Sequence, residues 1–371
     1  MKHYLDNAAT TMVCPEAADA AVNAMLRVYG NPSSTHTMGR EARTLLNQSR
    51  EAVSSALGAR DASEVVFTSC GSESDNWALL AGAESMKRQG KHIISSLTEH
   101  DAVRKSLDLL ESRGFSVTRL RPDSTGRIDP ETVREALRED TVLVSLMMVN
   151  NETGAVTDIH AVSGILKKAG SSALLHTDAV QAFRKIPFLA RNLGADMISV
   201  SGHKIHAPKG IGALYLRSGL KLKPLIVGGA QENGLRAGTE PLPQIAAFAA
   251  ACAQDAQVSH IREMKQLAVR MLTESVPELH YLDTEAPHIL SVSMPGWRSE
   301  VLMNFLEGRG IFVSKSSACK QGKRSHVLEA LGMRPDMIDG ALRISFSRYT
   351  SKEDLEALAE GLKEARNLAH R

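Results

Sequence analysis

The sequence predicts an α/β protein, with a large domain built on a doubly wound, mainly parallel sheet and a smaller α+β domain after it. Short runs rich in β-branched residues alternate with helical patterns as far as Pro241 and Pro243. This alternation is typical of parallel sheets that helices cover on both faces. Beyond the two prolines, an Ala-rich stretch leads to a second set of strands and helices. The length of 371 residues also exceeds one small core and favours two or three domains.

We assign residues 15–243 to the large domain. Its expected strands are apolar runs of strand length, and helical patterns lie between most of them. The strands are expected at 64–69, 92–96, 115–120, 141–149, 173–177, 196–201 and 212–217. The helices are expected at 74–88, 100–113, 130–138 and 158–169.

The smaller domain is assigned to residues 244–371. Residues 1–14 are too short to form a domain and could pack on either one, and we group them with the smaller domain. An Ala-rich helical stretch is expected at 244–275. The other expected elements are strands at 288–294, 311–314 and 342–347 and helices near 299–309, 324–331 and 352–369.

Composition argues against several classes of protein. Lys and Arg total 44 and Asp and Glu total 42, so the net charge of +2 gives no global electrostatic case for a nucleic-acid or membrane surface. Asp6 and Asn7 interrupt the N-terminal apolar residues, and no run approaches the length of a membrane span. The 4 cysteines lack CxxC spacing, which disfavours a metal site. We expect a cytoplasmic protein with reduced thiols and no bound metal.

A turn of small residues separates the first expected strand of the sheet from the helix after it. In "EVVFTSCGSESDNWALL" (64–80) this turn contains Gly71 and Ser72. A helix N-terminus in such a turn exposes backbone N–H groups and favours an anion, such as a phosphate. A plain Ser or Asp helix cap is the alternative.

Polar residues also follow the other strands, and ligands of open α/β sheets bind beyond the carboxyl ends of strands. Asp178 and Gln181 follow one apolar run, Asn151 follows another, and His100 and Lys204 follow two more. A buried Asp178 needs a partner, which could be a protonated ring nitrogen, a backbone cap or an arginine. His100 could equally be a structural residue at a strand–helix junction.

Taken together, these residues fit a site for pyridoxal 5'-phosphate. Such a site needs a lysine that forms a Schiff base, an acid opposite the pyridine nitrogen and a cup for the phosphate. Lys204 would carry the aldehyde and later move protons. Asp178 would keep the ring nitrogen protonated, so that the ring can absorb electrons.

The chain resembles the cysteine desulfurases, the NifS/IscS-like branch of the class V aminotransferase superfamily of fold-type I pyridoxal phosphate enzymes. The resemblance covers nearly the whole chain, with the motifs in family order. The matching segments are "YLDNAATT" (4–11), "GNPSSTHTMGREAR" (30–43), "FTSCGSESDN" (67–76), "TEH" (98–100), "VNNETG" (149–154), "HTDAVQ" (176–181), "SGHKIHAPKGIGALY" (201–215), "LRAGTE" (235–240), "SSAC" (316–319) and "LRISFSRYT" (342–350).

The resemblance implies a role for each matching residue. Lys204 would hold the cofactor, His100 would stack on its ring and Asp178 would pair with its nitrogen, while Asn151 and Gln181 would face its phenolic oxygen. Gly71, Ser72, Ser201 and His203 would form the phosphate site. Thr239 would reach the phosphate of a second subunit, which implies a homodimer with shared active sites. Arg343 would hold the substrate carboxylate, Asn31 would also bind the substrate, and His36 would lie near the site.

Cys319 matches the sulfur-accepting cysteine of the resembled family. The cations Lys315, Lys320, Lys323 and Arg324 surround it in sequence without an acid between residues 315 and 326. Nearby cations lower the pKa of a thiol, and a thiol at pKa ~7 would be about half thiolate at pH 7. A solvated basic loop around a small buried cysteine is the alternative that the residues alone leave open.

The resemblance implies conversion of L-cysteine to L-alanine, with a persulfide left on Cys319. The sulfur would pass to an acceptor protein, such as an iron–sulfur scaffold or a tRNA thiolase, with no direct contact to nucleic acid or membrane. Selenocysteine lyase, a class V aminotransferase or β-lyase without need of Cys319, and a scaffold that has lost catalysis are the alternatives. The retained Lys204, Asp178, His100 and Arg343 argue against the scaffold.

Three positions depart from the family pattern. The segment after Cys319 is shorter by about two residues, and Lys315 replaces a small residue before it. Cys70 replaces a typical glycine in the phosphate turn. Gln231 stands where a histidine is usual in the Gly-rich segment 228–239.

Overall fold

The structure is a computed structural model that describes residues 2–316 and 324–369. A seven-stranded sheet forms its larger part, in the order β2 (Val65–Thr68), β8 (Gly212–Leu216), β7 (Met197–Ser201), β6 (Leu174–Asp178), β5 (Thr141–Ser145), β3 (His92–Ser96) and β4 (Ser116–Leu120). Neighbours from β4 to β7 are parallel, and β8 runs antiparallel to both β7 and β2. The prediction of a mainly parallel sheet is confirmed.

Both faces of this sheet are buried, which explains why its strands read as continuous apolar runs. Leu174 and Met197 enter the core on one face, whereas the next residues, Leu175 and Ile198, enter the core on the other. Successive side chains of a strand point to opposite faces. A sheet covered on both sides therefore needs apolar residues at odd and even positions of each strand alike.

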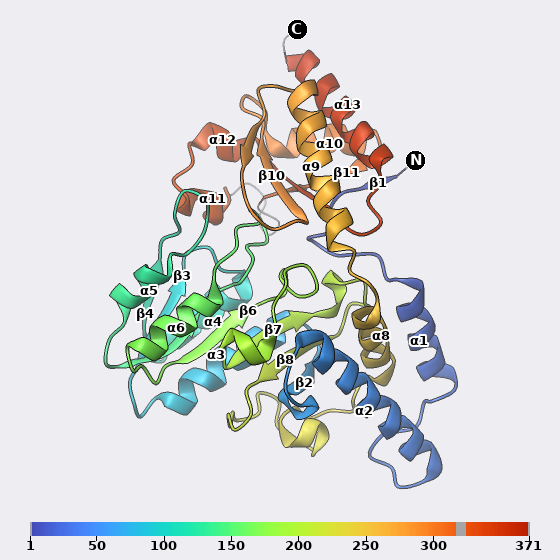
Figure 1. The fold of residues 1–371 in the computed structure, drawn as a ribbon, viewed down its shortest axis with the longest axis vertical. Helices are drawn as coiled ribbons and strands as arrows, with labels where there is room; N and C mark the ends of the chain where they lie inside the picture. Colours follow the sequence, from blue (N-terminus) through green and yellow to red (C-terminus); the bar gives the residue numbers. More distant parts are fainter. Residues whose placement is uncertain (1, 317–323, 370–371) are drawn as a thin grey trace.

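Helices cover the large sheet. Helix α3 (Gly71–Met86) packs on β5 to β8 and against α4 (Asp101–Ser112), and α5 (Pro130–Ala136) packs against α6 (Ile159–Lys168). The short α7 (Ala190–Leu193) packs on α6. Two helices near the N-terminus, α1 (Pro15–Leu26) and α2 (Thr37–Leu57), pack on α8 (Leu242–Ala253) at one side of this part (Figure 1).

The smaller part contains a four-stranded antiparallel sheet in the order β12 (Ser314–Lys315), β13 (Ala341–Ser345), β10 (Ile289–Ser293) and β9 (His280–Leu282). A separate parallel pair joins the N-terminal β1 (His3–Tyr4) to β11 (Ile311–Phe312). Both termini therefore lie with the smaller part, at the top of Figure 1. Its helices are α9 (Val258–Ser275), α10 (Ser299–Glu307), α11 (His326–Ala330), α12 (Pro335–Asp339) and α13 (Lys352–Ala369).

Three expected elements differ most from the structure. The single helical stretch 244–275 is two helices, because the chain breaks at 254–257, where Gln257 adopts a positive φ of 49° and the Asp255 carboxylate accepts its N–H. The strand expected at 141–149 ends at Ser145. The run 311–314 is two short strands that belong to different sheets.

The division into domains at residue 243 stays a prediction. Nearly all of helix α8 lies beyond that boundary, yet its apolar residues share one hydrophobic core with the large sheet. A second core joins α9 and α13 to β10 and β13. This partition favours a boundary in the break at 254–257 over one before α8.

Candidate active site

The predicted site residues come from strands that end at one edge of the large sheet. Asp178 ends β6, Ser201 ends β7, and the 3-10 turn Gly202–Lys204 follows directly. Gly71 begins α3 just after β2. Because β2, β7 and β6 run in the same direction, their carboxyl ends deliver these residues to the same edge.

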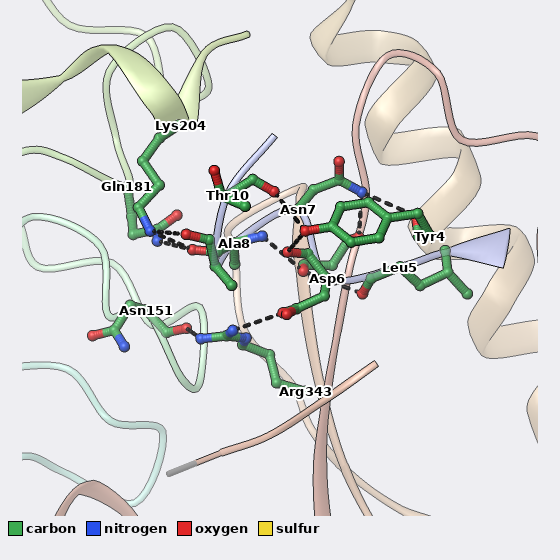
Figure 2. Close-up of polar contacts among 12 residues, drawn as sticks. Tyr4, Leu5, Asp6, Asn7, Ala8, Thr10, Asn151, Gln181, Lys204 and Arg343 are labelled. Atoms are coloured by element: carbon green, nitrogen blue, oxygen red, sulfur yellow. Dashed lines mark hydrogen bonds and ion pairs between the residues drawn. The ribbon is translucent and has the colours of Figure 1, made fainter. Parts of the chain in front are cut away.

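Lys204 points at the backbone of the N-terminal segment, residues 5–10. Its Nζ donates to the carbonyl oxygens of Ala8 and Ala9, each at 2.7 Å (Figure 2). Burial, and next to it the positive charge of Arg343, lowers the pKa of Lys204 from 10.5 to about 8. Near neutral pH this amine is therefore much more often uncharged, and nucleophilic, than an ordinary lysine.

Arg343 lies across the same segment. Its Nη2 donates to the Asp6 carboxylate at 2.9 Å and its Nη1 donates to the carbonyl oxygen of Asn151, also at 2.9 Å (Figure 2). The side chain is 2% exposed, and its Nε has no partner within the described residues. The guanidinium thus keeps donors for a further acceptor, although Asp6 already neutralises part of its charge.

Gln181 is held on two sides. Its Nε2 donates to the Ala8 carbonyl oxygen at 2.8 Å, which Lys204 also contacts, and its Oε1 lies 3.2 Å from Nε2 of the buried His288. Sequence reasoning missed both the N-terminal segment as a wall of the site and His288. The motif "YLDNAATT" was a signal for the segment, whereas no sequence pattern marks His288.

Asp178 is buried, and burial raises the pKa of its carboxyl group, while the positive charges of His100 and Lys204 oppose that shift. Its Oδ1 accepts the N–H of Val180 at 2.9 Å, so the backbone cap considered above is present. Two further carboxyl groups, Asp75 and Glu99, are buried near it, and burial also raises their pKa values, that of Glu99 to about 8. A cation placed opposite Asp178 would stabilise this acidic cluster.

The turn before α3 has the character of an anion site. Cys70 is the N-cap residue of α3 and makes no side-chain cap bond, so the alternative of a Ser or Asp cap is wrong. The Glu73 carboxylate instead accepts the N–H of Ser69 and pairs with Arg236. The Ser201 hydroxyl is buried without a partner among the described residues.

Gly71, at the end of this turn, lies beside Ser201, the last residue of β7. A Cβ on Gly71 would stand 3.6 Å from Cβ of Ser201 and 2.6 Å from Cγ2 of Val180. His203 follows Ser201 in the 3-10 turn Gly202–Lys204, with its Nδ1 3.2 Å from Thr10 Oγ1, and burial lowers its pKa to about 4. These residues offer a free hydroxyl, a neutral imidazole and a helix N-terminus to an anion.

Other predicted site residues have local contacts. His100 is exposed and caps α4, with Nδ1 accepting the Ala102 N–H at 3.2 Å, so the structural interpretation of this histidine applies alongside its charge effect on Asp178. Asn31 accepts the Ser33 N–H at 2.9 Å, and His36 caps α2. Thr239 is exposed. Within the described residues, no hydrogen bond joins Asn31, His36 or Thr239 to the group around Lys204.

Cys319 lies outside the described residues, so its role stays a prediction. Two of the cations near it in sequence are paired with acids from elsewhere in the chain. Lys315 Nζ lies 2.8 Å from Glu300, and Arg324 Nε lies 2.7 Å from Asp339. These pairs reduce the cationic field that the local sequence suggested for the thiol. Cys70, which belongs to the phosphate turn itself, is half-buried.

Residues 3–358 match the family described as aminotransferase class-V. The chain belongs to this family.

Among its class-V relatives, this chain is 38% identical over 363 residues to "Cysteine desulfurase IscS" of Dictyoglomus turgidum, which covers 95% of the chain and 91% of the relative. It is 37% identical to "Cysteine desulfurase NifS" of Azotobacter vinelandii, in a match that covers 95% of this chain and 90% of that relative. A solved structure described as a "NIFS-LIKE PROTEIN" superposes with a TM-score of 0.93 at 37% identity. The match covers 99% of this chain and 100% of that one. The resemblance to NifS/IscS-like proteins and the fold class are confirmed.

The residues of this class-V chain fit pyridoxal phosphate as the cofactor. The free Ser201 hydroxyl and the open start of α3 suit a phosphate, the buried acidic cluster at Asp178 suits a protonated ring nitrogen, and Lys204 suits an aldehyde. Across the ranges 2–316 and 324–369, no group of three or more metal-ligating side chains could hold a metal ion. In the same ranges, no helix has the length and apolar character needed to cross a bilayer.

Proposed function

We propose that the protein is a pyridoxal phosphate-dependent L-cysteine desulfurase that leaves a persulfide on Cys319. The observation that carries the proposal is the N-terminal segment that brings Lys204 and Arg343 together. Ala8 and Ala9 hold the amine of Lys204, and Asp6 holds the guanidinium of Arg343. An amine that reacts with aldehydes next to a carboxylate-binding arginine suits an amino-acid substrate.

When bound, pyridoxal phosphate would withdraw electrons from the α-carbon of the substrate. Lys204 would bind the cofactor aldehyde, and its amine, with a pKa of about 8, would move a proton to and from substrate carbon. Asp178 would keep the ring nitrogen protonated. Ser72, Ser201, His203 and the N-terminus of α3, which begins at Gly71, would bind the phosphate.

Arg343 would orient the substrate by its carboxylate, and His100 would lie over the ring. The thiolate of Cys319 would attack the sulfur of L-cysteine, so that the carbon–sulfur bond breaks and a sulfur–sulfur bond forms. The products would be L-alanine and a Cys319 persulfide, with no net oxidant. A relative described as "SspA in complex with cysteine", 33% identical at a TM-score of 0.83, supports a cysteine-sized site in this fold.

The proposal extends to partners. The persulfide sulfur would pass to an acceptor protein, such as an iron–sulfur scaffold or a tRNA thiolase. Thr239, exposed on the segment after Arg236, would complete the phosphate site of a second subunit in a homodimer. Selenocysteine would be an alternative substrate of the same residues.

The test measures sulfide and alanine released from L-cysteine in the presence of a dithiol reductant, for the wild type, Cys319→Ala and Cys252→Ala. We expect equal amounts of both products from the wild type, almost none from Cys319→Ala and nearly wild-type amounts from Cys252→Ala, which removes a thiol buried in α8 outside the site. Full activity of Cys319→Ala would instead favour a β-lyase or aminotransferase. A wild type that binds no pyridoxal phosphate would refute the proposal.

A further inference from the structure

Gln181 has one permitted amide orientation in this structure. A main-chain carbonyl oxygen can only accept a hydrogen bond, so the atom of Gln181 that lies 2.8 Å from the Ala8 oxygen must be its Nε2. The other amide atom, Oε1, must then be the one that faces His288. The orientation follows from the chemistry of the partner atoms.

The same logic decides the tautomer of His288. Since Oε1 of Gln181 only accepts, Nε2 of His288, 3.2 Å away, must carry the proton. Its Nδ1 is buried without a partner in the described part of the chain. The ring is fully buried, and burial together with the charges of Lys185, Lys265, Arg343 and Lys204 pushes its pKa well below 6.5, so it stays neutral. A neutral ring has one N–H, and Gln181 receives it.

This arrangement leaves Gln181 with one free donor. One N–H of its Nε2 goes to Ala8, whose oxygen also accepts from Lys204 Nζ at 2.7 Å. The second N–H remains for a ligand next to Lys204. Without His288, Oε1 would be a buried acceptor with no donor, which favours movement of the amide away from this geometry.

We propose that His288 is a positioning residue that fixes Gln181 so that its free N–H, and not its carbonyl oxygen, faces the ring oxygen of the cofactor. The proposal rests on the proposed function, since it concerns pyridoxal phosphate. It adds a residue outside the recognised motifs, placed just before β10 in the smaller part, whereas Gln181 belongs to the larger part. A donor at that oxygen would stabilise its anionic form and strengthen cofactor binding.

The first test needs no cofactor. Nitrogen NMR of the histidine rings in the apoprotein should show His288 as a neutral ring protonated at Nε2 across the pH range of the folded state. A ring protonated at Nδ1, or a charged ring near pH 7, would overturn the proposal even if the enzyme is an active desulfurase.

The second test measures the Kd for pyridoxal phosphate and the pH midpoint of the absorbance of the bound cofactor. His288→Gln can place an amide N–H near the position of Nε2, whereas His288→Leu is apolar. We expect His288→Leu to weaken cofactor binding about tenfold and raise the midpoint by about half to one pH unit, as for a lost hydrogen bond to a charged group. His288→Gln should stay within about twofold of the wild type.

A double variant separates positioning from general stability. In a Gln181→Leu background, His288→Leu should cause no further shift of the midpoint, because its effect acts through Gln181. An undiminished shift in that background, or a His288→Leu protein that binds and titrates like the wild type, would refute the proposal. A wild type that binds no cofactor would refute the proposed function and this inference with it.

Discussion

Arg343→Leu should weaken the binding of L-cysteine, and only because the substrate carboxylate loses its hydrogen bonds to the guanidinium. The buried guanidinium already makes two hydrogen bonds, to Asp6 and Asn151, and its Nε is unused in the described structure. A carboxylate that takes two charge-assisted hydrogen bonds from it would gain about 1.5–3 kcal/mol from each. Their loss, about 3–6 kcal/mol, corresponds to roughly a 10²- to 10⁴-fold fall in kcat/KM.

The assay compares L-cysteine with cysteamine, which has the amine and the thiol but no carboxylate. For Arg343→Leu, kcat/KM for L-cysteine should fall by the factor given above, while the Kd for cysteamine should change less than threefold. Asp6→Asn is the matched variant, because it removes the ion pair at 2.9 Å and keeps the guanidinium. It should leave L-cysteine binding intact or improve it, since one competitor for Nη2 loses its charge.

An equal loss for both ligands in Arg343→Leu would refute the reasoning. That outcome would mean that Arg343 serves to hold the N-terminal segment against Asn151, and that the substrate carboxylate binds elsewhere. Thermal unfolding of both variants controls for collapse of the segment.

The remaining predictions concern the cofactor site and two ion pairs outside it. Ser201→Ala should weaken pyridoxal phosphate binding about tenfold without lowering the thermal stability of the apoprotein, because the hydroxyl it removes is buried and unpartnered; a stability loss with unchanged affinity would contradict this. Competitive labelling of Lys204 should rise with a midpoint near pH 8 rather than 10.5, and because the folded pKa is the lower one, this group should add stability as the pH rises between those values. Glu232→Gln should lower the free energy of unfolding by about 3–5 kcal/mol, since Glu232 accepts from Arg50 at 2.6 Å through both oxygens and from the N–H of Phe67; Asp336→Asn, at an exposed pair, should leave the urea midpoint unchanged.

The break in the Ala-rich stretch shows the limit of local pattern. Ala and other good helix formers dominate 244–275, so propensity alone favours one helix. The chain turns at Gln257 because α8 packs on α1 and α2 while α9 packs on α13. Two separate packing surfaces outweighed a local preference worth only tenths of a kcal/mol per residue.

The sequence by itself determined the alternation of strands and helices and the kind of chemistry at the strand ends. Periodicity records which faces are buried, and a residue such as Asp178 or Lys204 keeps its position relative to its own strand. Those signals are local, because they depend on neighbours within a few positions.

Only the tertiary structure decided which of these residues meet. Arg343 reaches Asp6 across 337 positions, and Lys204 reaches Ala8 across 196. His288 meets Gln181 across 107 positions, and Glu300 pairs with Lys315 beside the Cys319 segment. Contacts of this kind arise from how whole elements pack, and a side chain with no periodic pattern or motif around it leaves no trace of its partner in the sequence.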